Sequence, residues 1–147
     1  MVPPSFNNKK NEQQNKWEDS PEAKFKELGF RPEWIEKGAD EPMITFAEKT
    51  GEYMAKNGLT NSKIRSIYGE LKRIQMGKFD KEKTAFYLLR PKVAYAQGRE
   101  QNNKGLQMFK LVFDKAAFLV KKESEFQNLC NLLEAILAYH RANGGKD

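Results

Sequence analysis

Residues 59–76, LTNSKIRSIYGELKRIQM, constrain the fold most strongly, because their apolar side chains recur at the three-and-four spacing of one helical face. The residues on this face are Ile64, Ile67, Tyr68, Leu71 and Ile74. Thr60 precedes them, where a threonine is expected to cap a helix through its side-chain oxygen. The segment therefore predicts an amphipathic helix whose apolar face is buried against the rest of the chain.

The same helix carries a basic flank. At about 100° per residue, Arg65, Gly69 and Lys72 fall together on a second side of the helix, with Arg73 beside them. A glycine inside a helix costs roughly 1 kcal/mol relative to alanine. Gly69 is therefore expected where something large, such as a packed helix or a sugar-phosphate backbone, comes close.

The N-terminal region is expected to divide into a tail and a strap. Residues 1–19 are polar and contain few large apolar groups, so their burial cannot offset the entropy lost on ordering. Ser20 and Pro21 signal the start of a short helix that Gly29 ends, and the apolar residues up to Ile35 predict a strap over the main helices. We expect a flexible tail, residues 1–19, and a single helical domain, residues 20–147.

Long helices are predicted in the remainder of the chain. One begins near Pro42 and ends at Asn57-Gly58. After residues 59–76, Asp80 is expected to cap a helix whose apolar residues point nearly all round, which predicts a central position with a kink near Pro91.

Two further apolar stripes, within residues 106–120 and 126–137, predict helices that pack antiparallel. No strand alternation of useful length and no internal repeat occurs. The predicted fold is all-α, a compact bundle of about five to six helices with a flexible N-terminal tail.

One flank of the helix after residue 104 carries surplus apolar residues, which are Met108, Leu111, Phe118 and Leu119. A surplus of this kind predicts self-association, as stacked copies or a homodimer, or contact with another subunit. The alternative is a central helix that is covered on several sides within one chain.

The charge balance favours a polyanionic partner. Lys and Arg number 26 against 20 Asp and Glu, which gives a net charge of +6. The alternative is a well-solvated surface rich in Lys and Glu. No apolar run approaches the length that spans a bilayer and no signal peptide is apparent, so a cytoplasmic protein without membrane contact is expected.

Residues with catalytic chemistry are few. Cys130 is the only cysteine and lies on an apolar face, so neither a disulfide nor a thiolate metal cage is expected. His140 is the only histidine and has no partners for a triad or a metal site. The carboxylates are scattered and the glycines form no phosphate loop. We therefore expect no enzyme activity, no metal and no cofactor.

Binding through basic residues is the remaining function. The candidate contacts lie on the helix of residues 59–76 and on the next helix and loop, and they are Lys63, Arg65, Lys72, Arg73, Arg90, Lys92 and Arg99. The alternative is that Arg65 and Arg73 form surface salt bridges with Glu52, Glu70 or Glu82. Tyr68, Tyr87 and Tyr95 are candidates for base stacking, although burial in the core is the favoured interpretation for each of them.

Two runs, LTNSKIRSIYGELKRI (59–74) and LLRPKVAYAQGR (88–99), resemble the small subunit of type III-A CRISPR effector complexes. The helix pattern of residues 105–142 agrees with that family, whereas the tail and the strap match no motif. The resemblance implies a non-catalytic subunit of a ribonucleoprotein complex in antiviral defence. It would stack in several copies beside other subunits and contact guide RNA and target RNA at their phosphates, through the seven basic residues named above.

Two alternatives come from other classes of protein. The helix that ends at Asn57-Gly58 and the helix that starts near Thr60 have the spacing of a helix-turn-helix, which predicts a DNA-binding regulator. However, the basic flank continues to Arg73, whereas a recognition helix reads bases near its N-terminal end. The other alternative is a helical adaptor that binds only protein.

Overall fold

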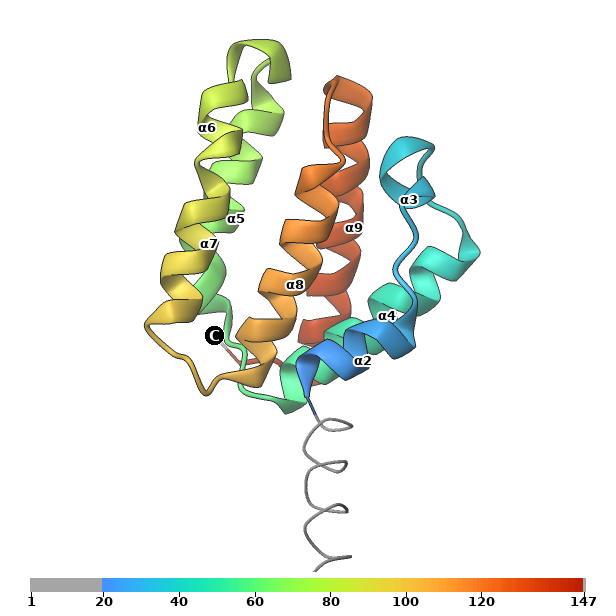
Figure 1. Cartoon of the computed structure of the whole chain (residues 1–147), viewed down its shortest axis with the longest axis vertical. Coiled ribbons are helices and arrows are strands. Elements are labelled where there is room, and N and C mark those ends of the chain that lie inside the picture. Colours follow the sequence, from blue (N-terminus) through green and yellow to red (C-terminus); the bar gives the residue numbers. More distant parts are fainter. Residues whose placement is uncertain (1–19, 147) are drawn as a thin grey trace, which may run out of the picture.

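The part of the chain that the structure describes is helical. A computed structural model describes residues 20–146, which contain helices and no strand. Six helices have eight or more residues, which confirms the predicted all-α bundle (Figure 1). They are α2 (Pro21–Leu28), α4 (Glu41–Lys56), α5 (Asn61–Met76), α7 (Leu89–Gly98), α8 (Lys104–Phe118) and α9 (Glu123–Ala142). The shorter elements are α3 (Glu33–Glu36), the 3-10 helix η1 (Phe79–Lys81) and α6 (Lys83–Tyr87). The predicted flexible tail lies outside the described residues.

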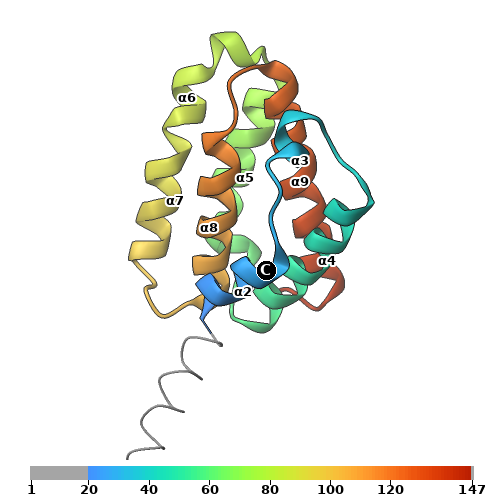
Figure 2. The same ribbon diagram turned by 45° about the vertical axis from the view of Figure 1, so that its right-hand side comes forward.

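Helices α8 and α9 run antiparallel, as predicted, in the middle of the bundle (Figures 1 and 2). In Figure 1, α5, α6 and α7 lie on one side of this pair, and α3 and α4 lie on the other. The most extensive contact of α9 is nevertheless with α4. Gly51 allows this close crossing, because a Cβ atom there would lie 2.6 Å from the backbone nitrogen of His140 and from the carbonyl oxygen of Ile136.

The segment from α2 to α3 forms the predicted strap. Gly29 ends α2 in the left-handed conformation with φ 70°. The chain then places Trp34 in the core, with its ring centroid 5.0 Å from that of Phe46 on α4. Asn128 on α9 donates from Nδ2 to the carbonyl oxygen of Ile35 at 2.8 Å. The strap is thus fastened to both α4 and α9.

Helix α5 buries the apolar stripe that its sequence predicts. The fully covered residues are Ile64, Ile67, Leu71 and Ile74. Thr60 occupies the position before the helix, but the predicted capping bond is wrong, because its hydroxyl oxygen lies 3.0 Å from Oγ of Ser62 instead. The backbone N–H of Asn61 donates to the carbonyl oxygen of Lys146 at 2.8 Å. The C-terminal segment thus supplies a hydrogen-bond acceptor for one of the free N–H groups at the start of α5.

The predicted kink is present as a break at Leu88, between α6 and α7 and three residues before Pro91. The prediction that Asp80 caps this helix is wrong, because Asp80 lies within η1. This extra turn forms because Phe79 is buried, where it stacks on Phe126 at a centroid distance of 5.2 Å.

The prediction that α7 is central is wrong. Only Leu89 and Val93 of α7 are buried, whereas Leu88 and Tyr95 are 52% and 68% exposed. Helix α7 lies at the edge of the bundle and packs against α5 and α8 on one side (Figure 2). The central position belongs to α8, most of whose residues are buried. Apolar residues on the outer side of α7 are therefore available for another role.

Candidate nucleic-acid interface

A groove between α5 and α7 brings together three of the predicted RNA contacts, Lys63, Lys92 and Arg99. Its volume is about 490 Å³, and its lining residues are Lys63, Ser66, Leu88, Pro91, Lys92, Tyr95, Ala96 and Arg99. Residues 88, 92, 95 and 99 are four, three and four positions apart, so they share the outer face of α7. The α5/α7 groove therefore places three cations beside apolar and aromatic surface.

Tyr95 presents its ring to solvent in this groove. The side chain is 68% exposed, and the guanidinium carbon of Arg99 lies 5.7 Å from the ring centroid. An exposed ring among cations can stack on a base while the cations bind neighbouring phosphates. The sequence alone did not separate this role from burial in the core, although the spacing of Tyr95 from Lys92 and Arg99 was a usable signal.

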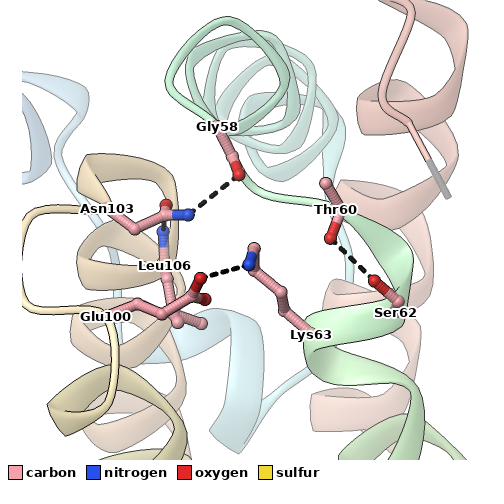
Figure 3. Close-up of polar contacts among 7 residues, drawn as sticks. All are labelled: Gly58, Thr60, Ser62, Lys63, Glu100, Asn103 and Leu106. Carbon is pink, nitrogen blue, oxygen red and sulfur yellow. Dashed lines mark hydrogen bonds and ion pairs between the residues drawn. The ribbon is translucent and has the colours of Figure 1, made fainter.

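Glu100 pairs with Lys63 at one end of the α5/α7 groove (Figure 3). Both side chains are partly exposed, so the pair remains accessible to solvent. Close by, Asn103 donates from Nδ2 to the carbonyl oxygen of Gly58 at 2.9 Å and accepts at Oδ1 from the backbone N–H of Leu106 at 2.8 Å (Figure 3). These bonds join the loop after α7 to the turn before α5, which fixes this end of the groove.

Two predicted contacts on the second half of α5 are paired with carboxylates. Arg73 contacts Glu70 at 3.1 Å and Glu82 at 3.2 Å, and its hydrogen bonds hold the pKa of the Glu70 carboxyl below its usual value. Lys72 lies 3.7 Å from Glu134 on α9, and a hydrogen bond with the side chain of Tyr68 raises the pKa of Lys72. Neither cation lines the α5/α7 groove.

Arg65 and Arg90, the other two predicted contacts, lie in other grooves. Arg65 lines a groove of about 500 Å³ between α5 and α9, beside Tyr68 and Arg141. Arg90 lines a larger groove of about 900 Å³ that α2, α7 and α8 border, where its guanidinium carbon lies 5.6 Å from the ring centroid of Phe118. The structure thus brings together three of the seven predicted contacts and distributes the other four.

The groove bordered by α2, α7 and α8 contains most of the predicted apolar surplus. Leu111 and Leu119 line it, and Phe118 is 63% exposed there. Met108 belongs to the core instead, with no exposed surface. Besides Arg90, Lys121 lies over the Phe118 ring, with its ammonium 5.1 Å from the centroid. This α2/α7/α8 groove is the main exposed apolar surface of α8.

The side chains most capable of nucleophilic or acid–base chemistry have structural environments. Cys130 is buried, and the loss of solvent raises the pKa of its thiol to about 12. His140 is fully buried, with Nε2 2.7 Å from the carbonyl oxygen of Leu59. Within residues 20–146, no His, Cys, Asp and Glu side chains group in a way that could hold a metal ion.

A model of the family Csm2 Type III-A matches residues 38–146. The match begins after α3, so it covers the helices of the α5/α7 and α5/α9 grooves, whereas α2, which borders the third groove, and α3 lie outside it. Neither the curated proteins nor the solved structures include a significant match to this chain. In the described part of the chain, no helix is both long and apolar enough to cross a membrane.

Proposed function

The chain belongs to the Csm2 Type III-A family and is a small subunit of a type III-A CRISPR complex, and on this premise we propose that it binds RNA in its α5/α7 groove. Lys63, Lys92 and Arg99 would neutralise phosphates of target RNA or guide RNA, and Tyr95 would stack on a base. The contacts carry no base-specific hydrogen bonds in this proposal, which suits a subunit that must accept any target sequence.

The exposed ring of Tyr95 beside three cations carries this proposal. The lysines and the arginine alone would suit a well-solvated surface, and the Tyr95 ring, which is 68% exposed in the same groove, adds a surface on which a base can stack. The three cations and the ring come from two helices that meet along one groove. Charge and stacking surface are thus available to the same strand of RNA.

We propose that the subunit has no catalytic role. The thiol of Cys130 is buried with its pKa raised to about 12, which is the opposite of an activated nucleophile. The imidazole of His140 is buried against the backbone of Leu59, where it fixes the turn before α5. Both side chains therefore have structural roles that account for their positions.

We further propose that neighbouring copies of the subunit contact each other through the α2/α7/α8 groove. Phe118 presents apolar surface that the described residues leave exposed, and the partly buried Leu111 and Leu119 extend this surface. A few phosphate contacts per copy bind RNA weakly, and copies held side by side on one strand multiply that affinity. Association through this groove would leave the α5/α7 groove accessible on the far side of α7.

The packing of α4 and α5 disfavours a DNA-binding helix-turn-helix. Such a motif requires the two helices to pack directly on each other. Here α4 packs mainly against α9, whereas α5 packs mainly against α7. Consecutive helices with suitable spacing thus belong to different sides of the bundle.

A titration of the full chain with a fluorescein-labelled oligouridylate at low ionic strength tests the proposal. Replacing Lys63, Lys92 and Arg99 together by Ala should weaken binding about 100-fold and lower the magnitude of the salt slope by about 2, at about 0.7 per contact. The matched control replaces Arg31, Lys37 and Lys49, which removes the same charge around α3 and α4. Equal losses in both variants would contradict a specific groove, and no RNA binding by the wild type would favour a protein-only adaptor.

A further inference from the structure

A second cation-lined groove lies on the opposite flank of α5, where α5 meets α9. Its volume is about 500 Å³, and its lining residues are Asn61, Ile64, Arg65, Tyr68, Glu134, Leu137, Ala138 and Arg141. Arg65 and Arg141 are both exposed. Glu134 is the acidic residue in this lining and is already paired with Lys72 at 3.7 Å. The lining of the α5/α9 groove thus contains two guanidinium groups and one carboxylate, where the start of α5 meets the end of α9.

The composition of the α5/α9 groove suits a nucleotide. A guanidinium binds a phosphate through two parallel hydrogen bonds, which makes Arg65 and Arg141 suitable phosphate ligands. Leu137 and Ala138 supply apolar surface for a sugar or a base. The first turn of α5 contains no acidic residue, so the positive end of the helix dipole adds to the field of the two arginines.

The exposed ridge of α5 separates the two grooves. Ser66 lines the α5/α7 groove, and its neighbour Arg65 lines the α5/α9 groove, so the two grooves meet along this ridge. One turn further along, Gly69 is exposed, and a Cβ atom there would meet no other atom within 4 Å. Packing within the chain therefore does not require this glycine. The helix propensity that Gly69 sacrifices relative to alanine is consistent with a partner, such as an RNA backbone, that passes close to α5.

We propose that the α5/α9 groove is a second site for RNA phosphates, in which Arg65 and Arg141 bind the strand that also occupies the α5/α7 groove. The strand crosses α5 over Gly69, where the ridge is lowest. This inference rests on the proposed function, and it adds Arg65 and Arg141 to the residues proposed there to contact RNA. Each copy then holds two consecutive parts of one strand, which fixes the path of the strand across the subunit.

The test measures binding of fluorescein-labelled oligouridylate to the full chain at low ionic strength. Replacing Arg65 and Arg141 together by Ala should weaken binding on the order of tenfold and lower the magnitude of the salt slope by about 1.4. The control R31A/K49A removes the same charge from a groove beside α2 and α4. It should leave both the affinity for RNA and the salt slope at their wild-type values. Gly69→Gln should also weaken binding, although it leaves every cation in place, and urea unfolding should show no loss of stability.

The outcomes separate the second site from the proposed function. If R65A/R141A binds like its control while K63A/K92A/R99A loses affinity, the second site is overturned and the proposed function stands. If R65A/R141A weakens binding but Gly69→Gln does not, the path over α5 is overturned. If the wild-type chain binds no RNA, both the second site and the proposed function are overturned.

Discussion

The carboxylate of Glu100 is paired with the ammonium of Lys63 at the end of the α5/α7 groove. In the proposed function this carboxylate occupies the position that an RNA phosphate would take beside Lys63. RNA must therefore displace Glu100 before Lys63 can contribute to binding. The pair is partly exposed, so its displacement costs no more than about 1 kcal/mol.

Replacing Glu100 by Gln should strengthen RNA binding. Removing the competing charge releases Lys63 for phosphate, and about 1 kcal/mol corresponds to an affinity gain of up to about fivefold. Anisotropy titration at several salt concentrations measures the change. Glu82→Gln is the matched control, because Glu82 pairs with Arg73, which lies outside the groove. An equal gain in both variants would indicate only a general effect of net charge.

Two glycines should respond in opposite directions to replacement by alanine. Gly51→Ala should destabilise the fold by about 2–4 kcal/mol, because the new Cβ would lie 2.6 Å from backbone atoms of α9. Gly69→Ala should stabilise the fold by about 1 kcal/mol, because its Cβ meets no atom and alanine has the higher helix propensity. Urea unfolding monitored by circular dichroism measures both. A loss of stability in Gly69→Ala would show that the ridge of α5 is packed.

The thiol of Cys130 should be unreactive in the folded protein at pH 9. Burial raises its pKa from 9.0 to about 12, so at pH 9 the unfolded thiol is half ionised while the folded thiol keeps its proton. The stabilisation that comes from this neutral thiol is complete below about pH 9 and decreases as the pH rises toward 12. Labelling with iodoacetamide, with and without urea, tests this prediction. Rapid labelling of the native chain would show that α9 exposes Cys130.

Replacing Phe118 by Asp should weaken association between copies. The change places a charge in the apolar α2/α7/α8 groove, where a neighbouring copy would have to desolvate it. Light scattering over a concentration series should show a smaller apparent mass for the variant than for the wild type. Ile44→Asp, at an exposed apolar residue outside this groove, is the control. A monomeric wild type at every concentration would contradict the proposed contact.

The sequence predicted which segments form helices better than it predicted where each helix lies in the bundle. Periodicity identified α5 and its buried stripe correctly, because an amphipathic helix needs only one covered face. The same reasoning predicted a central position for α7 and was wrong, because the apolar residues of α7 point in several directions although only one side meets other helices. An apolar residue such as Leu88 looks the same in a sequence whether a core or an external partner covers it.

The candidate site could be predicted only in part. Basic residues were identified by type, but their division among three grooves depends on how α5 packs between α7 and α9. Carboxylates from distant elements decide which cations are already paired, as Glu82 and Glu134 do for Arg73 and Lys72. No local pattern in the sequence predicts these long-range pairs. Nor does any local pattern predict that Arg65 and Arg141 line the same groove.

Crosslinking of the assembled complex to target RNA that contains 4-thiouridine, followed by mass spectrometry of the peptides, tests the α5/α7 groove most directly. We expect RNA adducts on the peptides of residues 88–99, centred on Tyr95, and on those that contain Lys63. Tyr95→Ala should remove the adduct from residues 88–99 without unfolding the chain, because the ring is exposed. Adducts confined to α2, α3 and α4, with none along the groove, would contradict RNA binding between α5 and α7.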